Sequence, residues 1–224
     1  MNLKSYWSAR QKEVEKALNV FLPKASVKPS TMHQSMRYSL FAGGKRLRPI
    51  LALAAADVIT GKHINAIPSA CAVECIHTYS LVHDDLPCMD NDDFRRGKPT
   101  NHKVYGDGIA VLAGDALLTI AFEITAHTKP TSRYSIADFI KELSFASGSL
   151  MLIAGQVGDI EAEGKKANFS QLRWIHERKT AALITSSIRM GAMAANATPA
   201  QLKALTDFGK NLGLAFQVVD DILD

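Results

Sequence analysis

Cysteine, aromatic and charged residues are all scarce in this sequence of 224 residues. The three cysteines are an odd number without framework spacing, which favours a reducing compartment over a disulfide scaffold. Hydrophobic residues make up 47% of the chain without any low-complexity stretch, so disorder is excluded and one substantial core is possible. The segment 1–18 is too rich in charge for a signal peptide or a membrane span. We therefore expect a cytoplasmic protein without a membrane span.

A large excess of charge of one sign is also missing. The formal net charge is only +4 and the basic residues form no long stripe, so nucleic acid is not expected as a partner. The basic residues instead form two short clusters: Lys45, Arg46 and Arg48, then Arg95, Arg96 and Lys98. The second cluster directly follows a run of aspartates. Acidic and basic residues at neighbouring positions are expected where a protein binds a metal ion together with an anionic ligand.

The motifs of several enzyme classes do not occur. The sequence contains no Gly-x-Ser-x-Gly, His-Glu-x-x-His or glycine-rich dinucleotide pattern, which leaves hydrolases and dehydrogenases without support. Cys71, Cys75 and His77 offer only three neighbouring zinc ligands at an unusual spacing, so we interpret the cysteines as core residues.

Eight prolines divide the chain into segments in which apolar residues recur every three or four positions, which is typical of helices. Helices are predicted over 69–86, 108–127, 132 to about 163, 170–195 and 199–224. Pro199 fits the first position of the last helix, with Thr198 as its N-cap. We predict an all-α, single-domain helical bundle over 1–224. The longest loop is expected at 87–108, and three glycines make 155–164 a second weak point.

Two aspartate clusters follow apolar helical segments. They comprise Asp84, Asp85 and Asp90, then Asp220, Asp221 and Asp224. Carboxylates four residues apart share a helical face, where they repel each other unless a cation joins them. Gln217 shares the face of Asp220 and Asp224. Asp84 and Asp90 are six apart, but Pro87 ends or kinks the helix and lets the chain double back.

The clusters predict a magnesium site. Magnesium commonly binds through one or two carboxylates, with water and substrate phosphates completing its shell. A calcium-binding EF-hand is excluded, because a loop that opens at Asp90 would place Phe94 and Arg95 where a ligand and a glycine are needed. The alternative is a merely solvated acidic face, which the preceding apolar helices disfavour.

Residues 43–49, Gly-Gly-Lys-Arg-Leu-Arg-Pro, resemble a phosphate cradle before a helix that is predicted to start at Pro49. Glycines allow close backbone approach, and lysine and arginine supply charged donors. The segment is not a Walker A loop, because Ser39 and Arg46 replace required residues of that motif.

His77 and Ser80 lie seven and four residues before Asp84, so these three residues form a stripe on one helical face. His77 is either a ligand-binding residue beside the carboxylates or an ordinary core or surface histidine.

Taken together, these motifs resemble those of the trans-prenyl diphosphate synthases. The matching segments, in the order of the family, are 43–49, 77–90, 95–97, 179–180 and 216–224. Pro87 and Cys88 match an insertion in the first aspartate motif that is typical of the bacterial farnesyl diphosphate synthase branch.

The resemblance implies the isoprenoid synthase fold, an all-helical bundle around a central cavity, in a homodimer. The two aspartate motifs would face each other across the cavity mouth and bind three Mg²⁺ ions. Asp84 and Asp90 would bind metal directly, Asp85 would support them, Asp220 would hold the third ion, and Asp224 would act through water.

The resemblance also implies the substrates, isopentenyl diphosphate and an allylic diphosphate. The residues that match allylic contacts are Arg95, Lys179 and Gln217, and those that match the isopentenyl diphosphate site are Gly44, Lys45, Arg48, His77 and Arg96. The reaction would proceed by ionisation, condensation and elimination. Dipoles of Lys179, Thr180 and Gln217 would stabilise the allylic cation, and the released diphosphate would accept the proton.

Product length would be set on the helix before Asp84, where one turn rises by about 5.4 Å, comparable to one isoprene unit. Ser80 and Tyr79 occupy the positions one turn upstream. The bulky Tyr79 would stop growth at the farnesyl product, unless it is an ordinary core tyrosine.

The resemblance thus favours a farnesyl diphosphate synthase, with a geranyl or geranylgeranyl diphosphate synthase as the alternative. A terpene cyclase or a non-catalytic partner subunit is disfavoured by the two intact aspartate motifs. Family members continue beyond the second motif, so we expect this chain, which stops at Asp224, to lack a C-terminal portion.

Overall fold

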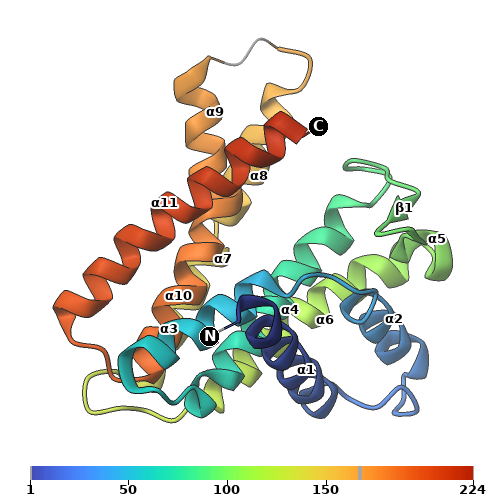
Figure 1. The fold of residues 1–224 in the computed structure, drawn as a ribbon. Helices are drawn as coiled ribbons and strands as arrows, with labels where there is room; N and C mark the ends of the chain where they lie inside the picture. The colour runs from blue at the N-terminus through green and yellow to red at the C-terminus, as the bar shows by residue number, and fades with distance from the viewer. Residues whose placement is uncertain (1, 166–167, 224) are drawn as a thin grey trace.

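Helices make up most of the described chain (Figure 1). The computed structural model describes residues 2–165 and 168–223, without the side chains of residues 220, 221 and 223. Its helices are α1 (Leu3–Phe21), α2 (Ser30–Leu40), α3 (Leu47–Thr60), α4 (Ile67–Asp84), α5 (Asn101–Tyr105), α6 (Asp107–Ala126), α7 (Ile136–Ser147), α8 (Leu152–Ala162), α9 (Phe169–His176), α10 (Ala182–Ala194) and α11 (Pro199–Leu223). The chain also forms the 3-10 turn η1 (Ile64–Ala66), the π-helical turn η2 (Glu177–Ala181), and an antiparallel pair of two-residue strands, β1 (Phe94–Arg95) and β2 (Lys98–Pro99). The predicted all-α fold is confirmed.

Helix α4 lies at the centre of the core. It packs along α6 and also contacts α3, α10 and α1, because most of its residues between 69 and 82 are small or apolar and buried. Gly114 on α6 permits a close approach, since a Cβ there would lie 2.1 Å from Nε2 of His83. The 20-residue α6, with a mean hydropathy of 1.8, is long and apolar enough to cross a membrane. Only 44% of that apolar window is buried, and the packing against α4 accounts for that part alone.

The prediction of one helix from 132 to about 163 is wrong, because α7 and α8 divide this segment. Helix α7 begins only after Ser135, whose side chain forms a capping box with Asp138. Gly148 ends α7 in an extended conformation, and the chain turns before Leu152. The apolar spacing continues through this break, so periodicity alone does not reveal it.

Other boundaries differ less. Helix α3 begins at Leu47 and not at Pro49, and the loop 87–108 contains the short hairpin and α5. The capping role of Thr198 is confirmed: its Oγ1 accepts from the Gln201 N–H at 3.3 Å, and Gln201 Oε1 accepts from the Thr198 N–H at 2.8 Å.

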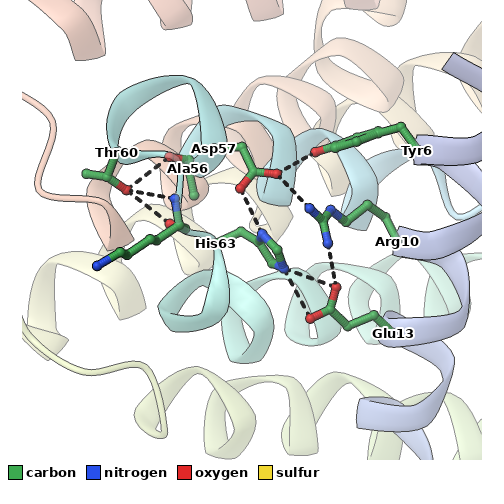
Figure 2. A network of polar contacts seen from close by, with 8 residues as sticks. Tyr6, Arg10, Glu13, Ala56, Asp57, Thr60 and His63 are labelled. Atoms are coloured by element: carbon green, nitrogen blue, oxygen red, sulfur yellow. Dashed lines mark hydrogen bonds and ion pairs between the residues drawn. The ribbon is translucent and has the colours of Figure 1, made fainter. Parts of the chain in front are cut away.

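A polar network fastens α1 to the end of α3 (Figure 2). Asp57 on α3 accepts hydrogen bonds from Tyr6 Oη at 2.8 Å and from Arg10 Nη2 at 3.2 Å. His63 lies with Nδ1 2.8 Å from Asp57 Oδ1 and with Nε2 3.0 Å from Glu13 Oε2. Burial acts to raise the pKa of Asp57, but the hydrogen bonds from His63 and Tyr6 outweigh it and hold that pKa below its usual range.

Replacing Asp57 with asparagine is expected to lower the free energy of unfolding at neutral pH by about 1–3 kcal/mol, the scale of hydrogen bonds to charged groups. Because its folded pKa is depressed, the carboxylate contributes stability above its unfolded pKa, about 4, and loses it as the pH falls through the folded pKa. Urea unfolding should therefore show wild type and variant converging in acid. Asp115→Asn, at an exposed carboxylate on α6, is the control. A difference that stays constant at every pH would contradict this account.

Candidate active site

A cavity of about 1070 Å³ opens between α4, α8, α11 and the segment from α9 to η2. Most of the predicted site residues line it: Arg48, His77, Tyr79, Ser80, Asp84, Asp90, Arg95, Lys179, Thr180 and Gln217. Apolar side chains such as Leu118, Leu152 and Ile160 form much of the remaining wall. A second cavity of about 730 Å³, between α7, α10 and α11, contains none of the predicted residues. Predicted site residues from both halves of the chain therefore line the same cavity.

Asp84 and Asp90 lie on either side of a tight return of the chain. Asp84 is the last residue of α4, and the Asp90 N–H donates to its carbonyl at 2.8 Å. The chain thus doubles back, as the position of Pro87 predicts. Burial raises the pKa of Asp84 to about 6, and the nearby charge of Asp90 also acts to raise it. Two carboxylates that face one partly buried space repel each other, and a divalent cation would relieve that repulsion.

Asp85 takes a different place from its neighbour. It is only 3% exposed and is not among the residues that line the cavity. Its Oδ1 accepts a hydrogen bond from Arg95 Nε at 2.7 Å and forms an ion pair with Arg95 Nη2 at 2.6 Å. Arg95 itself lines the cavity. Asp85 therefore orients the arginine predicted to contact the allylic diphosphate, which fits a supporting role better than direct metal binding.

The basic loop, residues 43–48, has an unusual backbone. The φ angles of Gly43, Gly44 and Arg46 are positive, at 101°, 126° and 52°. A Cβ on Gly44 would lie 2.4 Å from Nη1 of Arg96, and that guanidinium donates a hydrogen bond to the Gly43 carbonyl. The φ of 126° therefore favours glycine at position 44, and a Cβ there would also displace the Arg96 guanidinium.

The three basic side chains of this loop do different things. Arg46 is buried, with Nη1 2.8 Å from Glu74 Oε1, and it also donates to the Leu40 carbonyl at 2.7 Å. It is a structural residue. Lys45 is exposed, and Arg48 reaches the cavity.

His77 lies among positive charges at the cavity wall. Its pKa is held well below the usual range, first by burial and then by neighbouring arginines, beginning with Arg48 and Arg96. Burial also lowers the pKa of Arg48, to about 10, which leaves it charged at neutral pH. A neutral imidazole between charged guanidinium groups is a favourable environment for an anion.

The opposite wall is built around the π-helical turn η2. Lys179 Nζ lies 2.5 Å from Oδ2 of Asp159 on α8. Thr180 Oγ1 donates to Oε1 of Gln217 on α11 at 2.7 Å. The three residues predicted to face the allylic cation are thus brought together, at the place where the helix departs from α geometry.

The family model that describes polyprenyl synthetases matches residues 29–224. The chain belongs to the polyprenyl synthetase family. The resemblance to the trans-prenyl diphosphate synthases is thereby confirmed. Similar solved structures confirm the expected fold. A synthase of FPP or GFPP from Zymomonas mobilis, in its apo form, superimposes with a TM-score of 0.91 at 35% identity, covering 100% of this chain and 81% of that one.

The relatives of this chain have names of two product classes. The chain is 51% identical over 226 residues to a chloroplastic geranylgeranyl pyrophosphate synthase of Catharanthus roseus, covering 100% of this chain and 62% of that protein. It is 47% identical over 224 residues to the farnesyl diphosphate synthase of Bacillus subtilis, covering 99% of this chain and 75% of that protein. The chain spans about three fifths of the length of the first curated relatives that it matches.

The second aspartate motif follows Gln217 at the end of α11. The predicted metal ligands Asp220 and Asp224 lie outside the residues whose side chains are described. Among the side chains that are described, no three carboxylate, imidazole or thiol groups are grouped closely enough to hold a metal ion. The full metal-binding set stays a prediction.

Three polar cavity residues outside the matched motifs were not predicted from the sequence: Gln156, Asp159 and His176. Gln156 Nε2 is buried without a hydrogen-bond partner in the described part of the chain. The sequence signal that could have found two of them is the spacing of Gln156 and Asp159, which are three residues apart and so share one face of a largely apolar helix.

Replacing Gly155 with alanine is expected to destabilise the fold by about 1–3 kcal/mol, the cost of overpacking. The new Cβ would lie 2.2 Å from the backbone nitrogen of Lys179 and 2.6 Å from its Cα, so α8 and η2 would have to separate. Gly108→Ala is the matched control, because a Cβ on this helical glycine meets nothing within 4 Å. Urea unfolding that shows equal stability for both variants would contradict the close contact.

Proposed function

We propose that this chain belongs to a Mg²⁺-dependent prenyltransferase that condenses isopentenyl diphosphate with dimethylallyl and geranyl diphosphate to give farnesyl diphosphate. This proposal rests on one observation: the same cavity is lined by the side chains of Asp84, Asp90, Lys179 and Arg48. Carboxylates next to cationic side chains suit a ligand made of metal and diphosphate together. The apolar wall suits a growing hydrocarbon chain.

The allylic diphosphate would bind at the aspartate end of this cavity. Arg95 and Lys179 would donate to its oxygens, each oriented by a carboxylate, Asp85 and Asp159 respectively. Asp84 and Asp90 would hold Mg²⁺ there, with Asp220 and Asp224 from the second motif. When bound, Mg²⁺ supplies the positive charge that lets diphosphate depart.

The rest of the cavity would protect the allylic cation. Its apolar side chains would exclude water once substrate is bound, and the hydrogen-bonded Thr180 and Gln217 would turn oxygen dipoles toward the positive charge. The released diphosphate would take the proton in the elimination step, so no side chain need act as a base.

Isopentenyl diphosphate would bind at the basic loop. Gly44, Lys45 and Arg48 would approach it from the loop, and Arg96 and His77 from the facing elements. Because the depressed pKa keeps His77 neutral, the imidazole can donate one hydrogen bond while the arginines supply the charge.

The farnesyl product is supported by Tyr79. Its ring lies on α4 in the cavity wall, is 5% exposed, and packs edge-on against His83 with 5.8 Å between ring centres. Ser80 beside it is small and donates to the His77 carbonyl at 2.9 Å, so the tyrosine is the larger obstacle below Asp84. A geranylgeranyl product is the second candidate, because relatives of about 50% identity carry that name.

We also propose that residues 1–224 form one domain of a cytoplasmic homodimer. Support for a partner comes from apolar side chains that are exposed on α6 and α7, among them Val111, Leu112 and Phe145. Apolar side chains that gather in one exposed patch are typical of protein interfaces.

The proposed activity is tested by incorporation of labelled isopentenyl diphosphate into geranyl and dimethylallyl diphosphate by the full-length protein. Incorporation should require Mg²⁺, stop on treatment with EDTA, and return when Mg²⁺ is restored. Activity that survives removal of metal would contradict the mechanism, and the chromatographic length of the product decides between the two candidates.

A further inference from the structure

Helix α1 carries two side chains that reach the basic loop. Trp7 Nε1 donates to the Lys45 carbonyl at 3.0 Å, and Gln11 Nε2 donates to the Gly44 carbonyl at 3.0 Å. The preceding carbonyl, of Gly43, accepts from Arg96. Three successive carbonyls of the loop are therefore each held by a side chain from another element.

The loop needs such support because its backbone is strained. Arg46 has a side chain and yet adopts a φ of 52°, and it precedes α3 without any side-chain cap. A residue in this region of backbone space persists only where its surroundings hold it. The buried pair of Arg46 and Glu74 holds one end of the loop, and the α1 side chains hold its middle.

Helix α1 is itself firmly seated. Val14 and Leu18 on one face are completely buried in the core. On another face Tyr6, Arg10 and Glu13 point toward the end of α3, where they meet Asp57 and His63 (Figure 2). Trp7 and Gln11, one helical turn apart, thus project from a fixed support.

We propose that Trp7 and Gln11 are positioning residues for the second substrate: they set the backbone of the basic loop so that Lys45 and Arg48 meet the diphosphate of isopentenyl diphosphate. The proposal rests on the function proposed for that loop. Neither Trp7 nor Gln11 lines the cavity, so they act only through the loop. Both precede the segment 29–224 that the family model matches.

The test uses Trp7→Phe and Gln11→Leu in the full-length protein, because each keeps the bulk of the side chain and removes the donor. Each variant should raise the KM for isopentenyl diphosphate about three- to tenfold, the scale of one hydrogen bond. The kcat and the KM for the allylic substrate should change by less than about twofold. Lys12→Leu, which adds the same apolar side chain at an exposed neighbouring position, should leave all three constants unchanged.

Two results would overturn the proposal: an unchanged KM for isopentenyl diphosphate, or equal rises in both KM values together with a lower Tm, which indicates a merely structural role. A second measurement does not depend on catalysis. Hydrogen exchange of the amides of residues 43–48 should be faster in Gln11→Leu than in Lys12→Leu. If the wild-type protein transfers no prenyl group, the proposed function is refuted. If the loop amides exchange at the same rate in Gln11→Leu and Lys12→Leu, the support of the loop by α1 is refuted, whatever the activity.

Discussion

Replacing Asp84 with asparagine should lower kcat by about 10²- to 10³-fold, the scale of losing one preorganised electrostatic group at a reacting centre. Asparagine keeps the shape of the side chain but cannot supply the negative charge that Mg²⁺ requires. Burial already raises the pKa of Asp84 to about 6, so the charged form is unfavourable in the metal-free fold. The variant should accordingly have an equal or higher Tm than wild type in metal-free buffer. Loss of activity with gain of stability separates a ligand from a structural residue.

Asp93→Asn is the matched control for this experiment. Asp93 belongs to the same acidic stretch but pairs with Lys103 at 2.7 Å and does not line the cavity. Its replacement should leave kcat within about twofold of wild type, since exposed ion pairs contribute little. An Asp84→Asn enzyme that retains more than about a tenth of the wild-type kcat would refute the proposed metal role.

Replacing Tyr79 with alanine should lengthen the product. The ring lies in the cavity wall on α4, the helix that ends at Asp84, and its removal opens space into which a longer chain can extend. Products longer than farnesyl diphosphate should rise at least about tenfold relative to it, the discrimination that a hydrophobic pocket achieves through bulk alone. Chromatography of the dephosphorylated products measures this ratio.

Tyr79→Phe distinguishes the bulk of this side chain from its hydroxyl group. The Oη atom is buried and has no hydrogen-bond partner among the described residues, and burial raises the pKa of Tyr79 to about 12. Phenylalanine should therefore leave the product unchanged. If Tyr79→Ala and Tyr79→Phe both give the wild-type product, the ring is an ordinary core side chain and another residue limits chain length.

The parts of the site that could be predicted are those that local sequence controls. The apolar spacing before Asp84 predicted α4, and Pro87 predicted that the chain returns so that Asp90 joins Asp84. The cradle at residues 43–49 was identified because glycine and basic residues stand together. These features depend on neighbours within a few residues, so spacing alone is informative.

The parts that could not be predicted depend on contacts between distant segments. Trp7 binds a carbonyl 38 residues away, and Asp159 meets Lys179 across 20 residues. No local pattern signals such pairs. The break at Gly148 was missed because the helical periodicity resumes on its far side, and Arg46 was grouped with ligand-binding residues although it pairs internally with Glu74.

The π-helical turn η2 has a consequence for how this protein can vary. Removing one residue from 177–181 would restore ordinary α geometry and rotate α9 against α10 by about 100°, the angle per residue of an α-helix. Since α10 is anchored on α3 and α4, Lys179 and Thr180 would lose their common alignment with the cavity. Substitutions here would alter single contacts. An insertion or deletion of one residue would instead reorient every side chain that η2 contributes to the cavity wall. Homologous proteins should therefore keep the length of this segment constant even where its amino acids differ.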